Sequence, residues 1–132
     1  MKVFIASLLI LIVMIAGGVA GDIYLQTVSA DINAFTDRID SAAGEEDFET
    51  VQSVHSELMK YWDKNEILLT ALVDHAHTVE IEKSMKEMEM SLAAKEGTEV
   101  LLSSAKVRME ITSIAENEHF HLKNIQIGRA HV

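Results

Sequence analysis

The sequence predicts an all-α protein, in which an N-terminal transmembrane helix is followed by an antiparallel bundle of four helices. Three observations predict this class. An uncharged, apolar run occupies residues 3–20. After it, apolar residues recur at spacings of three and four, which is the pattern of one buried helix face. The chain also has no proline to interrupt a helix and no cysteine to form a disulfide, so its stability must come from helix packing.

The apolar run reads VFIASLLILIVMIAGGVA and lies between Lys2 and Asp22. As a helix with a rise of about 1.5 Å per residue it is roughly 27 Å long, close to the hydrocarbon thickness of a bilayer. It has no polar face, so we interpret residues 1–21 as a transmembrane anchor or signal segment. Small residues around Gly18 and Ala20 fit a signal-peptidase site, but the long run and its single lysine favour a retained anchor. Lys2 inside and Asp22 outside predict a C-terminal domain outside the cytoplasm of a single-pass cell-membrane protein.

The first helix of the bundle is predicted to continue directly from the membrane segment. Its apolar seam comprises Leu25, Val28, Ile32, Phe35 and Ile39. Gly44 is expected to end this helix, because a left-handed C-cap favours glycine. The three acidic residues that follow, at positions 45–47, complement the positive N-terminal end of the next helix dipole.

A second apolar stripe runs from Phe48 to Leu92 and keeps its phase through the polar residues 63–66. Two interpretations follow. In the first, the chain forms two helices with a break near Asp63, whose side chain caps the second helix; this gives four helices and a compact bundle. Alternatively, one long helix covers residues 45–94, and the bundle has three helices. The turn at residues 95–98, with Thr98 as the next N-cap, precedes a last helix that continues to Ile125.

The final six residues, IGRAHV, have no helical period. One back-translation of residues 127–132 matches the start of a common sequencing adapter. We therefore interpret residues 127–132 as an adapter-derived tail, with a natural frayed terminus as the alternative. On either interpretation Gly128 ends the helical pattern, and we assign the extracytoplasmic bundle to residues 22–126.

The chain has a formal net charge of −10 at pH 7. An acidic domain is repelled by phosphate backbones, so nucleic acid is a poor partner. No cysteine is present and no serine lies in a recognisable nucleophile motif, so we expect no enzymatic activity and no cofactor. The predicted partners are the membrane, through residues 3–20, and another membrane protein.

A few polar residues fall on the apolar stripes and need an explanation, namely His55, His77, Glu80 and Glu118, with His75 one position off the seam. If the chain folds back near residues 65 and 96, these five side chains share one layer of the bundle. Imidazoles and carboxylates on facing helices can hold a transition metal or form a ligand site. The alternative is that they form buried, hydrogen-bonded pairs that set the helix register. Glu118 in particular would need a partner if it is buried.

Several short motifs resemble one known family. They are Trp62 with Lys64-Asn65, Leu72-Val73-Asp74-His75 with Ile81-Glu82, and a closing Glu118-x-x-x-Leu122-x-Asn124-Ile125. Together with the N-terminal membrane segment they resemble the uncharacterised bacterial family known as domain of unknown function 4363. The resemblance covers residues 1–125 and implies a membrane-associated helical protein with no established activity. The family pattern carries an acidic residue where His77 stands, so the resemblance makes His75 the better ligand candidate of the two.

The sequence therefore favours a membrane-anchored extracytoplasmic helical module with an interaction or accessory role. The alternative is a sensor bundle that binds a metal ion or small ligand through the layer of histidine and glutamate side chains.

Overall fold

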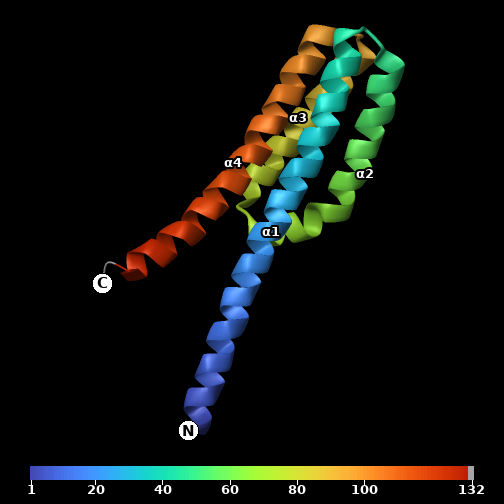
Figure 1. Ribbon diagram of the computed structural model, residues 1–132. Helices are drawn as coiled ribbons and strands as arrows, with labels where there is room; N and C mark the ends of the chain where they lie inside the picture. The colour runs from blue at the N-terminus through green and yellow to red at the C-terminus, as the bar shows by residue number, and fades with distance from the viewer. Residues whose placement is uncertain (131–132) are drawn as a thin grey trace.

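The computed structural model describes the backbone of residues 1–130 and the side chains of residues 1–117. Four helices make up the fold: α1 (Lys2–Gly44), α2 (Phe48–Leu72), α3 (His75–Ala93) and α4 (Gly97–Ala130). Each helix packs against the next one along the chain, and α4 closes the bundle against α1 (Figure 1). The all-α class and the antiparallel four-helix bundle are thus confirmed, with the upper half of α1 as the first bundle helix.

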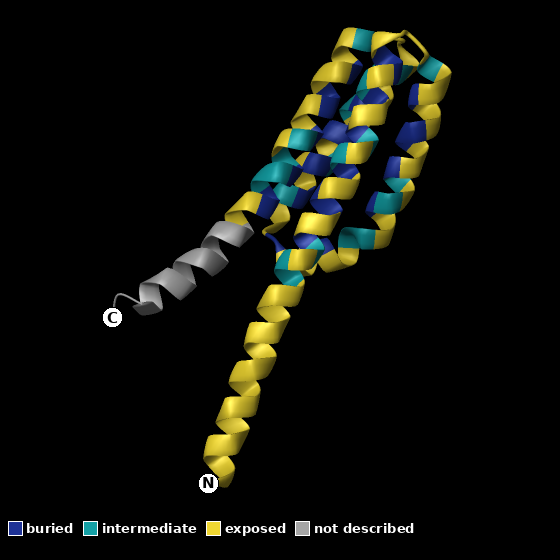
Figure 2. Ribbon diagram, in the orientation of Figure 1, coloured by how far each residue is buried: buried dark blue, intermediate teal, exposed yellow. Residues whose placement is uncertain are grey.

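Helix α1 has two halves with different surroundings. Its first half projects from the bundle as a single helix, and every residue as far as Ala20 is exposed (Figure 2). Its most apolar 18-residue window has a mean hydropathy of 2.8 and no buried residue. From Leu25 onward the same helix forms one wall of the core, with Val28, Ile32 and Ile39 almost fully buried. The prediction that the apolar run continues as one helix into the bundle is confirmed.

The core follows the predicted apolar stripes. From α2, α3 and α4 the buried apolar side chains include Val51, Leu58, Trp62, Leu69, Ile81, Met85, Met88, Val100, Val107, Ile111 and Ile114. Trp62 is the largest of them and is 2% exposed. Burial of apolar surface on this scale is the main favourable contribution to the fold. No disulfide adds to it, because the chain has no cysteine.

The position of the second turn was not predicted correctly. Both the break near Asp63 and the unbroken helix over residues 45–94 are wrong, because α2 continues to Leu72 and the chain turns at Val73 and Asp74. Val73 is extended, with φ −125° and ψ 164°, and the Asp74 side chain caps α3 by accepting a hydrogen bond of 3.1 Å from the Ala76 amide. The apolar stripe keeps its phase through residues 63–66. The buried face of α2 is therefore uninterrupted there, and the helix continues.

Residues 63–66 nevertheless mark a change in the direction of α2. Figure 1 shows the last turns of α2 bending across the base of the bundle toward α1. Within this stretch the Asn65 side-chain amide donates a 2.8 Å hydrogen bond to the Tyr61 carbonyl, four residues earlier. A side chain that takes a helical carbonyl in this way is a common feature of bent helices. The side-chain oxygen of Asn65 accepts a 2.7 Å hydrogen bond from the Tyr24 hydroxyl of α1.

The two turns at the far end of the bundle share one geometry. After α1, the amides of Glu46 and Asp47 bond back to the carbonyls of Ala43 and Ala42. After α3, the amides of Lys95 and Glu96 bond in the same way to Leu92 and Ser91. This is the Schellman motif, which needs a left-handed residue. Glu46 (φ 58°) and Lys95 (φ 54°) take that conformation, so the left-handed position expected at Gly44 is wrong by two residues.

Two further expectations at the α4 boundaries are corrected. Helix α4 begins at Gly97, and the Val100 amide bonds to the Glu96 carbonyl, so Glu96 rather than Thr98 is the N-cap. At its other end α4 passes through Gly128 to Ala130, so Gly128 does not end the helix. Residues 131–132 of the proposed tail lie outside the described residues.

Glycine at position 95 is expected to stabilise the bundle. Lys95 is left-handed, a conformation that glycine adopts without the Cβ clash of other residues. Lys95→Gly should raise the free energy of unfolding by about 0.5–1 kcal/mol. The neighbouring Ala94 is right-handed, with φ −83°, so Ala94→Gly should lower stability by a similar amount. Chemical denaturation of both variants followed by circular dichroism would test this; equal signs for the two changes would contradict it.

Candidate functional site

The four described residues of the predicted layer, His55, His75, His77 and Glu80, do not come together. Among the described side chains, His55 is buried, His77 is half-buried, and His75 and Glu80 are exposed. Glu118 belongs to α4, but its side chain lies outside the described residues, so its expected pairing with His75 and His77 is not tested. Glu80 precedes the fully buried Ile81, and a step of one residue on a helix turns its side chain away from the core.

His55 is held by the backbone of the neighbouring helix. Its Nε2 lies 3.1 Å from the Met85 carbonyl oxygen of α3, inside the bundle. A carbonyl oxygen can only accept, so Nε2 carries the proton and donates. Because the chain turns at residues 73–74 and not near 65, His55 lies level with Met85. Along α3, Met85 is about 15 Å from His75, at roughly 1.5 Å per residue.

His77 has an acidic partner, though not the expected one. Its Nδ1 lies 3.5 Å from an Oε2 of Glu110 on α4, and the two side chains are 40% and 35% exposed. A contact this exposed contributes little to stability. Within residues 1–117, no three His, Asp or Glu side chains are arranged so that they could hold a metal ion. The described residues therefore do not assemble the metal or ligand layer.

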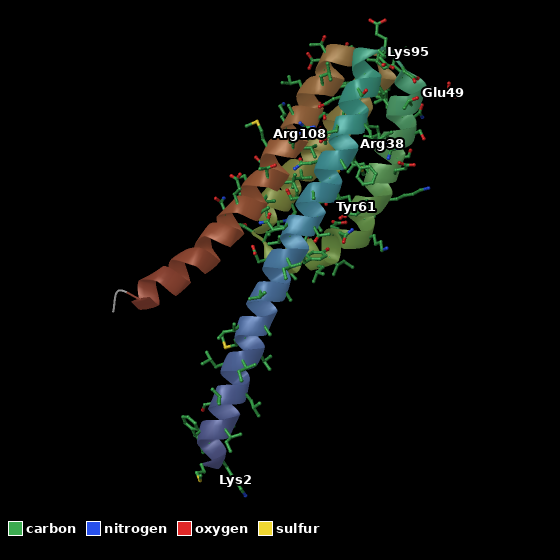
Figure 3. All side chains as sticks on the ribbon, viewed as in Figure 1. Lys2, Arg38, Glu49, Tyr61, Lys95 and Arg108 are labelled. Carbon is green, nitrogen blue, oxygen red and sulfur yellow. The ribbon has the colours of Figure 1, made fainter. Side chains whose placement is uncertain are left out.

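A groove next to His55 lies between the first turns of α2 and the last turns of α3. It is at the tip of the bundle, far from the apolar half of α1. We call it the tip groove. Its lining comprises Glu46, Asp47, Phe48, Glu49, Gln52, His55, Ser56, Glu89, Leu92, Ala93 and Lys95. Figure 3 labels Glu49 and Lys95 at this end of the molecule. His55 is buried, whereas the other lining residues are half-buried or exposed.

The tip groove has an acidic rim. Four carboxylates, from Glu46, Asp47, Glu49 and Glu89, face a single lining cation, Lys95. Asp47 also caps α2: it accepts a 2.6 Å hydrogen bond from the Thr50 hydroxyl and a 3.2 Å bond from the Thr50 amide. These bonds hold the pKa of Asp47 below its usual value, so this carboxylate is charged at neutral pH. Phe48 and Leu92 supply apolar surface inside the rim.

A second polar cluster, formed by Trp62, Glu66 and Glu82 toward the opposite end of α2, was not predicted from the sequence. The Trp62 Nε1 donates a 3.2 Å hydrogen bond to Oε1 of Glu82. The same Glu82 carboxyl hydrogen-bonds to Glu66, and this bond, followed by repulsion between the two charges, raises the pKa of Glu66. Two carboxyl groups can share such a bond only while one is protonated. The pairing of Glu66 with Glu82 depends on the α2–α3 register, so no local pattern predicts it.

Glu66→Gln is expected to remove part of the pH dependence of stability. A raised folded-state pKa means that the folded protein holds the Glu66 proton more tightly than the unfolded chain. The stabilisation is therefore present at acidic pH and is lost as pH rises through the folded-state pKa. Glutamine can donate to Glu82 at every pH. The variant should therefore be more stable than the wild-type protein at neutral pH by about 0.5 kcal/mol, the magnitude typical of a solvent-exposed pair.

Thermal unfolding of the wild-type protein and of Glu66→Gln at pH 4 and pH 7 would measure this difference. Glu80→Gln is the matched control, since Glu80 lies on the exposed face of α3. A Glu66→Gln variant whose advantage is the same at both pH values would contradict the shared proton.

Arg108 of α4 is another residue that sequence reasoning missed. Its guanidinium donates to Asp37 and, at 3.1 Å, to the buried Thr36 hydroxyl, and it lies 3.5 Å from Asp40. All three partners are on α1, so one side chain ties the first helix to the last (Figure 3). The spacing of Thr36 and Asp40 on one helix face is the only sequence signal for this cluster.

The fold defines the class of this protein: a helical bundle whose first helix extends into a long, exposed apolar segment. The family model described as "Domain of unknown function (DUF4363)" matches residues 19–125, and the chain belongs to this family. The resemblance found in the short motifs is thereby confirmed. Comparison with curated proteins and with solved structures gives no match.

Proposed function

We propose that this protein is a membrane-anchored interaction module, which holds a helical bundle outside the cytoplasm and presents its tip groove to another membrane protein. One observation carries the proposal: α1 is a single helix from Lys2 to Gly44, apolar and exposed in its first half and part of the core in its second. A helix of this kind joins a membrane span to a bundle without a flexible linker. The bundle would then keep a defined height and direction above the bilayer.

The height can be estimated from α1. From Gly21 to Gly44 the helix covers about 35 Å, at roughly 1.5 Å per residue. The tip groove would therefore lie well beyond the lipid headgroups. A site at that distance suits contact with an extracytoplasmic part of a partner protein.

The groove chemistry indicates what kind of segment would bind. Its acidic rim and its apolar residues Phe48 and Leu92 are complementary to a basic, amphipathic peptide segment. The described side chains bring no three metal ligands together, so the observations favour a protein partner over a metal ion. We propose binding without catalysis, because the groove has no Ser or Cys nucleophile next to a base: its one serine, Ser56, is exposed, and the His55 Nε2 is bonded to Met85.

Site-specific photocrosslinking tests this proposal. A benzophenone amino acid at Gln52, on the groove wall, should give an adduct with an integral membrane protein when the full chain is expressed in its native host. The same residue at Lys60, exposed on α2 but outside the groove, is the control. Charge reversal at Glu49 and Glu89 should abolish the Gln52 adduct. Equal adduct yields at the two positions, or an adduct that survives charge reversal, would contradict binding through the tip groove.

A further inference from the structure

The last turns of α2 expose an apolar face that the bundle does not use. Ile67 is 86% exposed, Leu68 is 49% exposed and Leu72 is 37% exposed, whereas Leu69 between them is 1% exposed. Exposed apolar side chains are common singly, but three within six residues form a continuous patch.

Helical geometry places these residues on one side. Ile67 and Ala71 are four residues apart, as are Leu68 and Leu72, so the four side chains form one face. Leu69 lies on the other side of the helix and is buried in the core, as Trp62 is. This segment of α2 is thus apolar on both its inner and its outer side. We call the outer side, formed by residues 67, 68, 71 and 72, the basal face.

The basal face belongs to the last turns of α2. These turns contact α1 near Gly21, where α1 passes from its exposed half into the bundle. A Cβ placed on Gly21 would lie 3.7 Å from Cδ2 of Leu72, and the Tyr24 hydroxyl bonds to Asn65. In Figure 1 the last turns of α2 reach α1 at the level where α1 leaves the bundle. The apolar run of α1 ends at Ala20, one residue before this contact.

We propose that the basal face lies in the outer interfacial layer of the bilayer, as a second membrane contact beside the span. The inference rests on the proposed membrane anchoring of α1. If residues 3–20 span the bilayer, Gly21 lies at its surface and Leu72 lies at the same level. Other apolar side chains are exposed at this level of the molecule, because Val19 is 40% and Ile23 is 60% exposed on the side of α1 opposite to Gly21.

The chemistry of the surroundings favours lipid acyl chains over charged headgroups as the attraction. The residues flanking the basal face carry three acidic side chains, Asp63, Glu66 and Asp74, against one cation, Lys64. These would not attract anionic lipids. Burial of Ile, Leu and Ala in the interfacial zone contributes through apolar area, which is the non-electrostatic part of the attraction that holds helices in the membrane plane. Contact should therefore persist in zwitterionic vesicles and at high salt.

Spin labelling of the full chain in phosphatidylcholine vesicles tests the proposal, since the chain has no natural cysteine. Four single-cysteine variants are needed. Ile67→Cys and Leu68→Cys report on the basal face, Ile12→Cys reports on the span, and Met90→Cys, 72% exposed on α3, reports on water. Each label is measured for collision with oxygen, which concentrates in lipid, and with a water-soluble nickel chelate.

At positions 67 and 68 the label should collide with oxygen several-fold more often, relative to nickel, than at position 90. High salt should leave this ratio unchanged. Nickel accessibility equal to that at position 90 would overturn the inference, and low accessibility to both reagents would replace lipid with a protein contact.

The label at position 12 separates this inference from the proposed anchoring. A lipid signature at position 12 with a water signature at position 67 would leave the anchor in place and overturn the basal contact alone. A water signature at both positions would overturn the anchor and, with it, the basal contact.

Discussion

Replacing both Leu11 and Ile12 with arginine is expected to abolish retention of the protein in the membrane. Both residues lie near the centre of the run at residues 3–20, where an arginine costs about 2.5–3.5 kcal/mol and an aliphatic residue contributes a few tenths. The double change therefore opposes insertion by about 6–8 kcal/mol. We expect the wild-type chain to resist alkaline carbonate extraction and the double variant to be released.

The matched control for this experiment is the exchange Leu11→Val with Ile12→Leu, which keeps the segment apolar and should leave retention unchanged. Mass spectrometry of the extracted wild-type protein adds a second measurement. An N-terminus at Gly21, or complete release of the wild-type chain by carbonate, would show that residues 1–21 are a signal segment and not an anchor.

Trp62→Ala is expected to lower the free energy of unfolding of the bundle by about 3–5 kcal/mol. Trp62 is the largest of the nearly fully buried side chains and lies where α2 faces α3. Its removal would leave a cavity, because a close-packed core relaxes only partly around a lost side chain. The Glu82 carboxylate would also lose its indole donor. Thermal unfolding of the full chain in detergent, followed by circular dichroism, would measure the change.

Two further variants separate packing from hydrogen bonding at this position. Trp62→Phe keeps most of the buried volume and removes only the Nε1 donor, so a loss of about 1 kcal/mol is expected. Met90→Ala, on the exposed side of α3, should change stability by less than about 0.5 kcal/mol. If Trp62→Ala had no larger effect than Met90→Ala, the placement of Trp62 in the core would be contradicted.

The proposed anchor, tip groove and basal face depend on one another mechanically. A second membrane contact through α2 would limit rotation of the bundle about α1, because α2 packs against α1 on one side only. The tip groove, at the other end of α2, would then face a fixed direction relative to the membrane. A partner anchored in the same bilayer gains from this restriction, since fewer orientations must be lost on binding.

Much of the architecture was predictable from local sequence because it depends on local properties. The apolar half of α1 follows from composition, and the buried positions Leu25, Val28, Ile32 and Ile39 follow from helical period. The motifs around Trp62 and Asp74 indicated the family, and the family model that matches residues 19–125 confirms the membership. The turn near residue 96 was marked by glycine, although the N-cap of α4 is Glu96, two residues earlier than the expected Thr98.

The end of α2 and the polar contacts between helices were decided only by the tertiary structure. The turn at Val73 and Asp74 contains neither glycine nor proline, and the apolar phase continues across it. Moving that turn by eight residues changes the partner of every side chain on α2 and α3, which is why His55 meets the Met85 carbonyl and Glu66 meets Glu82. A periodic pattern determines which side of each helix is buried, but it leaves the axial offset between two helices open. That offset depends on where the connecting turn lies and on how the side chains of both helices pack together.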